Sequence, residues 1–505
     1  MLAIIPSATL LGVEGRSVTV EVHVTGGIPG FTVVGLPDAS CREARDRVRA
    51  ALMSSDLDWP NKRITVNLAP TTVRKVGATF DLAVAIGLLV ASEQLERDRV
   101  EKLAFIGELG LDGAIRPVAG TVALADAAVA PVLVVPTVSV REASIAGRGE
   151  VRGVADLKEL VDALRGDQPW PDAPPPPVAV AEPPVPDLAD VRGQPGARKA
   201  LEVAAAGGHH LLMVGPPGAG KTMLATRLAG LLPRLSGGQA VEATCIHSAA
   251  GVTLPPSGLV ERPPFRAPHH GASLVALTGG GSGVMRPGEV SLASHGVLFL
   301  DELGEFAPSV LDALREPLED RVIRVSRAQA SVTFPADFLL IGAMNPCPCG
   351  QGDAPGSCRC SEFSRARYHR RLSGPLVDRF DVRVTVPRPD PSQLLGGGAG
   401  ECSARVADRV GAARERALAR GVRANAMLPA RSLDAEARLS DDAGGLLDLA
   451  LRNGRLTARG LGRIRRVALT VADLGARDGP LRAGDVATAL QLRADLLDLT
   501  TPRHG

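Results

Sequence analysis

Aromatic side chains, long apolar runs and a strong charge of one sign are all scarce in this sequence. Phenylalanine, tryptophan and tyrosine make up 3% of its 505 residues, so aliphatic side chains must fill the interior. The formal net charge of +2 gives no argument for a nucleic-acid partner, because that argument needs a concentrated basic face. The longest strongly apolar run, Leu82 to Ala91, is too short to cross a bilayer as a helix. A secretory signal would begin with basic residues, but none precedes Arg16. We therefore expect a cytoplasmic protein without membrane contacts.

Cysteine is also sparse, but it is unevenly placed. The chain has seven cysteines, and four of them lie between residues 347 and 360. Clustered cysteines in a large intracellular chain suit a metal site better than a disulfide framework. Cys347, Cys349, Cys358 and Cys360 offer four thiolates for a tetrahedral zinc site, although their C-x-C spacing is tighter than the usual C-x-x-C. Reduced cysteines and a redox pair are the alternatives.

The chain is long enough for about three domains, and its pattern changes along its length. Residues 1–166 alternate between strand-like and helix-like patterns, which predicts an α/β domain. Residues 167–186 are rich in proline, which lacks a backbone donor, so a semi-rigid linker is expected there. Residues 187–398 hold apolar strands separated by helical or glycine-rich segments, as in a parallel sheet covered on both faces. Residues 399–505 are predicted to be helical, without strands.

Apolar periodicity places the individual elements. Valines alternate from Val18 to Val24, which is typical of a half-buried strand. Further strands of the first domain are expected at 31–34, 63–68, 104–106 and 132–135, and helices at 42–53 and 80–91. Strands of the second domain are expected at 211–214, 297–300, 339–343 and 382–386.

A phosphate-binding motif follows the strand expected at 211–214. It reads Gly215, Pro216, Pro217, Gly218, Ala219, Gly220, Lys221 and Thr222, and a helical pattern begins directly after it. The glycines let consecutive backbone N–H groups curl around phosphates. Lys221 brings a positive charge to the β- and γ-phosphates, and the Thr222 hydroxyl is suited to ligate Mg²⁺. The motif therefore predicts that ATP and Mg²⁺ bind here.

Polar residues that suit ATP hydrolysis follow at later strand ends. Asp301 is placed to orient Mg²⁺, and Glu302 to polarise an attacking water. Asn345 ends the next apolar strand, where its amide would position that water or sense the γ-phosphate. Arg379 and Arg459 are candidates for a guanidinium that approaches the γ-phosphate, often from a neighbouring subunit. Each arginine taken alone would be read as a surface residue.

With these residues assembled, the chain resembles the magnesium-chelatase-like branch of AAA+ ATPases, and most closely its ComM/YifB group. Beyond the phosphate loop, the likeness is carried by the stretches Arg262–His270 (RPPFRAPHH), Arg286–Glu289 (RPGE) and Met344–Gly350 (MNPCPCG). It implies an αβα core, a helical lid and a ring of identical subunits, usually a hexamer. It also implies two pore-facing insertions, at about 251–288 and at the hairpin 322–334.

The resemblance assigns roles to residues already singled out. It implies that Asp190–Gln194 lies near the adenine and that Asn345 is the residue called sensor 1. Arg379 would be the finger that acts on the neighbouring subunit, and Arg459 the sensor-2 arginine of the lid. Within the first insertion, Gly279–Gly281 together with its arginine and histidines predicts a mobile loop carrying cationic groups. The alternative is that His269 and His270 merely bond neighbouring loops.

Residues 1 to about 165 resemble the Lon-protease-like domain that precedes the ATPase in this group. The likeness rests on Lys75–Asp81, Gly107–Leu109 and Pro117–Gly120. A serine–lysine protease needs a hydroxyl nucleophile and an amine that takes its proton. Thr79 occupies the nucleophile's place, but Val122 falls where the lysine should be, so we expect no proteolysis.

Three functions fit this combination of motifs. The resemblance to ComM favours an ATP-hydrolysing motor that binds branched or single-stranded DNA and drives branch migration of recombination intermediates in natural transformation. A magnesium-chelatase subunit that powers metal insertion is the second reading, although the Lon-like domain is foreign to it. The third is an AAA+ remodeller of protein substrates.

Overall fold

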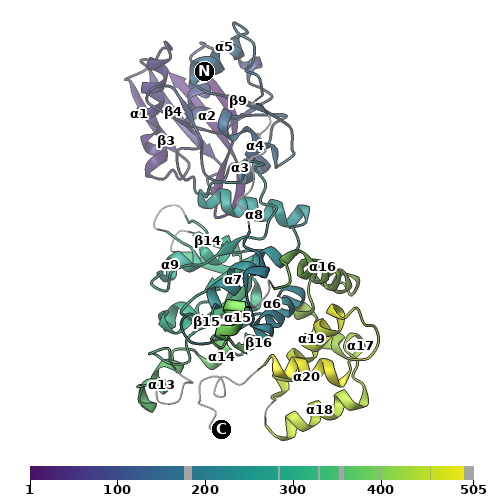
Figure 1. Ribbon diagram of the computed structural model, residues 1–505. Coiled ribbons are helices and arrows are strands. Elements are labelled where there is room, and N and C mark those ends of the chain that lie inside the picture. Colours follow the sequence, from purple (N-terminus) through teal and green to yellow (C-terminus); the bar gives the residue numbers. More distant parts are fainter. Residues whose placement is uncertain are drawn as a thin grey trace.

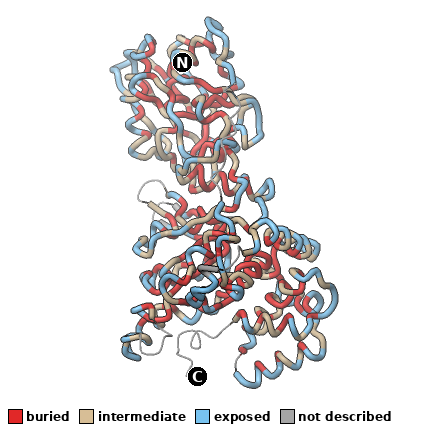
Figure 2. Tube along the Cα trace, in the orientation of Figure 1, coloured by how far each residue is buried: buried red, intermediate tan, exposed pale blue. Residues whose placement is uncertain are grey.

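The computed structural model contains two bodies, with α8 (Gly237–Ala250) lying between them (Figure 1). It describes residues 1–173, 175, 185–281, 285–327, 330–351, 358–396, 400–454 and 456–493. Half of the expected linker, residues 397–399 at the expected core–lid boundary and the last twelve residues therefore lie outside the described residues. Each body has its own buried interior (Figure 2). None of the described helices is both long and apolar enough to cross a membrane.

The N-terminal body is built from two sheets around one completely buried helix. One sheet has the order β1-β2-β4-β3, formed by β1 (Leu2–Leu11), β2 (Glu14–Thr25), β4 (Arg63–Ala69) and β3 (Gly30–Val34). The other is parallel, with the order β5 (Leu103–Phe105), β8 (Val132–Pro136) and β9 (Glu150–Val154). Every residue of α2 (Asp81–Ala91) is buried, as its unbroken apolar sequence requires. The remaining elements are α1 (Ala39–Ser54), β6 (Glu108–Leu109), β7 (Ile115–Arg116), α3 (Thr121–Ala127), α4 (Val140–Ser144) and α5 (Leu157–Arg165).

The second body is organised around a five-stranded parallel sheet. Its order is β11 (Phe265–Arg266), β12 (Val297–Leu300), β15 (Leu339–Met344), β10 (Leu211–Val214) and β16 (Val382–Thr385). Because all five strands run the same way, the residues that follow each strand gather at one edge of the sheet. The helices and the hairpin around it are α6 (Pro195–Gly207), α7 (Lys221–Leu228), α9 (Leu274–Thr278), α10 (Glu289–Leu292), α11 (Pro308–Asp312), α12 (Arg315–Asp320), β13 (Val322–Arg327), β14 (Ala330–Pro335), α13 (Glu362–His369), α14 (Gly374–Val377) and α15 (Pro391–Gly396).

The C-terminal part is helical, as expected, and packs against the sheet body beside α6 (Figure 1). Its helices are α16 (Ser403–Ala419), α17 (Leu433–Glu436), α18 (Asp441–Arg452), α19 (Ala458–Leu474) and α20 (Ala483–Gln491). Ile464 and Ala468 of α19 are fully buried and belong to the same apolar cluster as Leu211 of β10. The helical part and the sheet therefore share one continuous core.

The N-terminal body touches the second body at several places, two of which involve α8 and the β13–β14 hairpin. The backbone N–H of Gly120, at the start of α3, donates to the carbonyl oxygen of Ser248 in α8 at 3.0 Å. The Ser248 hydroxyl in turn donates to Glu142 of α4. At the second place, Leu11 and Val13 from the turn between β1 and β2 pack against the apolar cluster beneath the β13–β14 hairpin.

The expected strands and helices are confirmed almost residue for residue, but several short or edge elements were missed. The unexpected strands are β1, β6, β7, β9 and β11, together with the hairpin strands β13 and β14, which only the resemblance supplied. β1 contains Pro6, which interrupts its apolar pattern but is tolerated because β1 is an edge strand paired only with β2. β11 has two residues, too few to show any periodicity.

Candidate active site

The phosphate loop connects β10 to α7 in a conformation that only glycine adopts easily. Gly218 and Gly220 have φ angles of +77° and +90°, and a Cβ atom at either would face open space. Side chains are thus excluded by backbone conformation and not by crowding. The loop leaves its backbone accessible at the start of α7, as phosphate binding requires.

Lys221 lies at the centre of the site. Its side chain is buried, and its Nζ donates to the carbonyl oxygens of Gly215 at 2.6 Å and Pro216 at 3.0 Å. It also donates to Oδ1 of Asn345 at 3.1 Å. Burial lowers the pKa of Lys221, while Asp301 and Glu302 act in the opposite direction. The lysine of the phosphate loop therefore touches the amide at the end of the neighbouring strand β15.

Asp301 links the phosphate loop to β12. The hydroxyl of Thr222 donates to Oδ2 of Asp301 at 2.6 Å. The backbone N–H of Glu302 donates to Oδ1 of the same carboxylate at 2.9 Å. A hydroxyl and a carboxylate held together at the phosphate loop are the oxygen ligands that Mg²⁺ uses beside nucleotide phosphates.

Glu302 adopts an unusual conformation and has an unexpected partner. Its backbone is left-handed, with φ +51° and ψ 46°, which is uncommon for a residue other than glycine. Its Oε2 lies 3.0 Å from Nδ1 of His270, which follows β11 at the same edge of the sheet. The sequence left two readings of His270, a cationic group of a mobile loop or a histidine that bonds a neighbouring loop, and the contact fits the second reading, which named no partner. No local pattern links residues that lie this far apart in the chain, so this contact was not foreseen.

The two predicted arginines lie elsewhere. Arg379 precedes β16 and lines a cavity with His210, Asp381 and Arg463, at the edge where the strands begin. It forms an ion pair with Glu319, and burial together with nearby Arg463, Arg459 and Arg315 lowers the pKa of Arg379. Arg459 is thus a neighbour of Arg379. Within the described part of the chain, neither arginine is joined to Lys221 by a hydrogen bond.

The segment expected near the adenine contacts the phosphate loop directly. The side-chain amide of Gln194 donates to the carbonyl oxygen of Ala219 at 3.3 Å, and Gln194 itself is left-handed at φ +56°. Asp190 pairs with Arg227 of α7 at 3.0 Å. These bonds fix the segment Asp190–Gln194 beside the motif.

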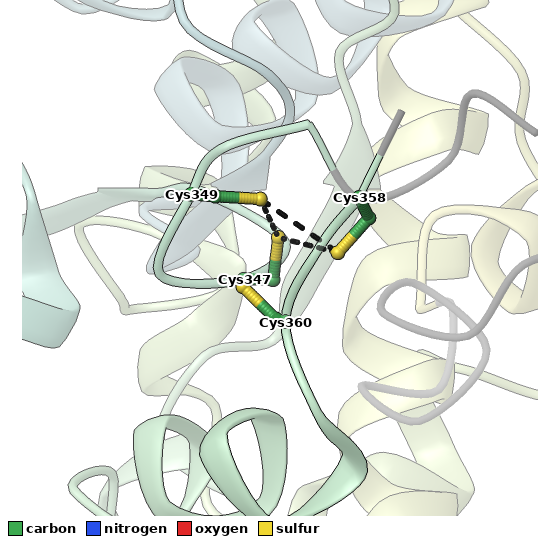
Figure 3. A group of neighbouring side chains, drawn as sticks. All are labelled: Cys347, Cys349, Cys358 and Cys360. Carbon is green, nitrogen blue, oxygen red and sulfur yellow. Dashed lines mark hydrogen bonds between the residues drawn. The ribbon is translucent and has the colours of Figure 1, made fainter. Parts of the chain in front are cut away.

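The four clustered cysteines converge directly after Asn345 (Figure 3). Their sulfur atoms all lie within 4.8 Å of one another, and Cys347, Cys349 and Cys358 are separated by 3.4, 3.6 and 3.7 Å. Sulfur ligands of a tetrahedral zinc, with Zn–S bonds of about 2.3 Å, would lie about 3.8 Å apart. A backbone N–H from Gln351 lowers the pKa of Cys349 to about 6, which favours the thiolate that metals bind. The donor set therefore fits zinc.

Two arginines, one in each of the regions expected to be insertions, pair with carboxylates. Arg266 makes a two-pronged ion pair with Glu289, at 2.6 and 2.7 Å. Arg324 of the β13–β14 hairpin pairs with Glu316 and Asp320, both at 2.8 Å. Arg266, in particular, anchors the insertion to the core instead of standing free on a loop.

Comparisons with known proteins point to one family. The profile described as magnesium chelatase, subunit ChlI, matches residues 187–394. Profiles described as subunit ChlI of Mg-chelatase and as the ChlI C-terminal part match residues 20–137 and 400–493.

Similar full-length relatives occur in distant bacteria. The chain is 45% identical over 500 residues to the Mycobacterium tuberculosis protein Rv2897c, covering 96% of this chain and 97% of that protein. It is 44% identical over 483 residues to the competence protein ComM of Haemophilus influenzae, covering 94% of each. It is 43% identical over 481 residues to YifB of Escherichia coli, again covering 94% of each.

Proposed function

The chain belongs to the magnesium-chelatase-like AAA+ ATPases of the ComM/YifB group, and from that premise we propose that it is a DNA-translocating ring motor. Its task would be to drive branch migration of recombination intermediates in the cytoplasm. The observation that carries the ATPase part is the convergence of Lys221, Thr222, Asp301 and Asn345 at one edge of the parallel sheet. The DNA part rests on the similarity to ComM, which is named as a competence protein.

We assign the steps of hydrolysis to individual residues. The backbone of Gly215–Gly220 and the ammonium of Lys221 hold the phosphates, and Thr222 with Asp301 holds Mg²⁺, which neutralises the charge that develops on them. Glu302 polarises the attacking water. Asn345 senses the γ-phosphate, and its side-chain amide, which accepts a hydrogen bond from Lys221 in this structure, would turn to the phosphate instead.

Arg379 and Arg459 complete the site of a neighbouring subunit. Arg379 lies at the edge where the strands begin, whereas the phosphate loop lies where the strands end, and the charge of Arg459 is close enough to lower the pKa of Arg379. A ring, with six subunits as in related AAA+ proteins, would bring this arginine pair to the next subunit's γ-phosphate.

We propose the domain boundaries expected from the sequence. Residues 1–166 are a Lon-like domain, 167–186 a linker, 187–398 the ATPase core and 399–505 the lid. Thr79 is buried, and Val122 is an apolar side chain that accepts no proton, so the N-terminal domain binds or organises but does not cleave. Zinc held by Cys347, Cys349, Cys358 and Cys360 would stiffen the loop beside Asn345.

An ATPase assay with three kinds of stimulant tests this proposal. A synthetic four-way junction or single-stranded DNA should raise the turnover of the wild-type protein and leave Lys221→Ala inert. The same junction should be unwound only while ATP is hydrolysed. A junction that neither binds nor stimulates would contradict the proposal. Stimulation by chelatase partners with porphyrin, or by an unfolded protein, would instead identify one of the two alternative functions.

A further inference from the structure

The strand β3 forms one edge of the first sheet of the N-terminal body, and β4 is its only neighbour among the described strands. The two strands are parallel, and the N–H of Gly30 donates to the carbonyl oxygen of Lys62 at 3.4 Å. Because the backbone groups of successive residues in a strand point to opposite sides, those of Phe31 and Val33 point away from β4. Within the described part of the chain, no other segment forms backbone hydrogen bonds with them. The edge therefore offers unpaired N–H donors and carbonyl acceptors.

The sequence of β3 does nothing to protect this edge. Natural edge strands are commonly shielded by a charged side chain, a proline or a bulge. The strand reads GFTVV and pairs with β4 over its whole length without a bulge. Apolar surface surrounds it, since Ile28 in the preceding turn is 89% exposed and the half-buried ring of Phe31 lies 5.8 Å from that of Trp59. A strand from another chain would find both backbone partners and apolar contacts here.

Three arginines of α1 lie beside the same edge. The helix α2 packs against β1 and β2, whereas α1, on the outside of this body, packs against α2 and β3 (Figure 1). The flank of α1 that faces α2 is marked by Arg47, which pairs with Asp81 at 2.6 Å. At about 100° per residue, Arg42, Arg45 and Arg49 fall on the opposite flank. They therefore project on the side of the free edge of β3.

These arginines leave an excess of positive charge beside β3. All three are exposed, and within the described residues none of their side chains forms a hydrogen bond or an ion pair. Asp46 is the one acidic residue of α1 on their flank. Along the helix axis Arg45 and Arg49 lie about 6 Å apart, and alternate residues of an extended strand lie about 6.8 Å apart. Carboxylates on alternate residues of an added strand would therefore match the arginines in charge and in spacing.

We propose that the free edge of β3 binds an extended acidic peptide of a partner protein. The peptide adds a strand to the sheet and pairs its carboxylates with Arg42, Arg45 and Arg49. DNA fits this edge less well, because its phosphates accept hydrogen bonds but donate none to the carbonyl oxygens of Phe31 and Val33. The N-terminal body would thus recruit a protein to the motor, and this role is independent of the residues assigned to hydrolysis.

Synthetic peptides test the strand addition. The probe is a fluorescein-labelled ten-residue peptide that alternates glutamate with valine, titrated against the full-length protein and followed by fluorescence anisotropy. We expect saturable binding, and none when lysine replaces glutamate. Two further peptides carry N-methyl groups on either the glutamate or the valine amides. Because only one set of amides faces β3, methylation of that set should weaken binding at least tenfold more than methylation of the other. Equal effects of the two methylations, or no saturable binding of the probe, would overturn the proposal.

A pair of double variants tests the arginines. Arg45→Gln combined with Arg49→Gln should weaken binding of the glutamate peptide about fivefold, because two exposed ion pairs are lost. Arg97→Gln combined with Arg148→Gln removes the same charge elsewhere on the N-terminal body and should leave the affinity unchanged. Basal ATPase activity and the melting temperature should stay at wild-type values in both. Equal losses of affinity in the two double variants would contradict recognition by α1.

Val33→Pro tests the backbone edge itself. Proline removes the outward N–H of this residue but leaves the ladder to β4 intact, and edge strands tolerate it. The variant should bind the glutamate peptide more weakly while the arginines remain. Single-stranded DNA that displaces the peptide from the wild-type protein would identify a nucleic-acid site instead. A changed oligomeric state of Val33→Pro in light scattering would identify an interface between copies of this chain, and either result would overturn the proposal.

Discussion

Among single residues, Lys221 dominates the electrostatics of the site. It is only 8% exposed, yet its ammonium donates to uncharged oxygen atoms of Gly215, Pro216 and Asn345. A buried charge is costly unless a charged group pairs with it, and burial accordingly lowers the pKa of Lys221. A nucleotide phosphate would supply that partner. Nucleotide binding should therefore raise the pKa of Lys221 again and release Asn345.

Glu302→Gln is the sharpest single-residue test of the hydrolysis step. The amide keeps the shape of the side chain but cannot take a proton from water, so kcat should fall about 100-fold or more. ATP affinity, measured with a fluorescent analogue, should stay unchanged because Lys221 and Asp301 are untouched. Glu305→Gln is a matched control, since Glu305 pairs with Arg371 at 2.8 Å. Equal losses in both variants would contradict the assignment.

The sequence predicts some residues of this site but not the contacts between distant ones, for a physical reason. Lys221, Thr222 and Asp301 were found because phosphate binding needs a fixed local order of glycine, lysine and hydroxyl after a strand, and an acid at the end of another. The contact of Glu302 with His270 depends on which strands are neighbours. That order is set by the packing of the whole sheet and by a two-residue strand, so no local pattern reveals it.

At the scale of elements, the cysteine loop forms part of the wall of the nucleotide site. It starts at Asn345 and returns past the phosphate loop at Gly350, which has φ +77°. A Cβ atom at Gly350 would lie 2.7 Å from Cδ of Pro217, so only glycine permits this approach. Loss of order in the cysteine loop would therefore disturb both Asn345 and the phosphate loop.

Removing two of the four sulfur ligands tests this connection. Cys358→Ser combined with Cys360→Ser should abolish the equimolar zinc that elemental analysis is expected to find in protein purified without chelator. It should also lower ATP affinity and the melting temperature, because the loop beside Asn345 loses its cross-link. Cys402→Ser, at a cysteine outside the cluster, should change none of these quantities. Wild-type protein without bound zinc would refute the metal site.

Elements were predictable where their sequence alternates or is continuously apolar. The strands β10 and β12 match expectation exactly, because each is a short apolar run bounded by turn residues. The edge strands β1 and β11 were not predicted in this way. β1 buries alternate residues only up to Ile5, includes Pro6 and then buries Ser7, Ala8 and Thr9 in a row, so its pattern is interrupted although its pairing with β2 is long.

At the scale of the whole molecule, the N-terminal body is joined to α8, which directly precedes the first expected insertion, and to the hairpin that forms the second. It bonds α8 through Gly120 and Glu142, and it packs beneath the β13–β14 hairpin through Leu11 and Val13. Displacement of the hairpin or the insertion during hydrolysis would therefore carry the N-terminal body along. This would give the N-terminal body a mechanical role that needs no protease chemistry.

Mixing inactive variants tests whether active sites form between subunits. Lys221→Ala inactivates the phosphate loop of its own subunit, whereas Arg379→Ala removes the arginine that the active site of the neighbouring subunit needs. Each variant alone should be inert. In an equal mixture, about a quarter of the interfaces would pair an intact phosphate loop with an intact arginine, so about a quarter of wild-type turnover should return. As a control, Lys221→Ala mixed with a variant that carries both Lys221→Ala and Arg379→Ala should stay inert, because no subunit then has an intact phosphate loop.

Arg459→Ala extends the same experiment to the lid. Because the charge of Arg459 acts on Arg379 and lowers its pKa, we expect Arg459 to serve the neighbouring subunit as well. Arg459→Ala should then regain turnover when mixed with Lys221→Ala, just as Arg379→Ala does. If Arg459 served its own subunit instead, every intact phosphate loop in that mixture would lack its arginine, and the mixture would stay inert. Recovery with Arg379→Ala but not with Arg459→Ala would therefore place the two arginines at different active sites, against the arrangement seen here.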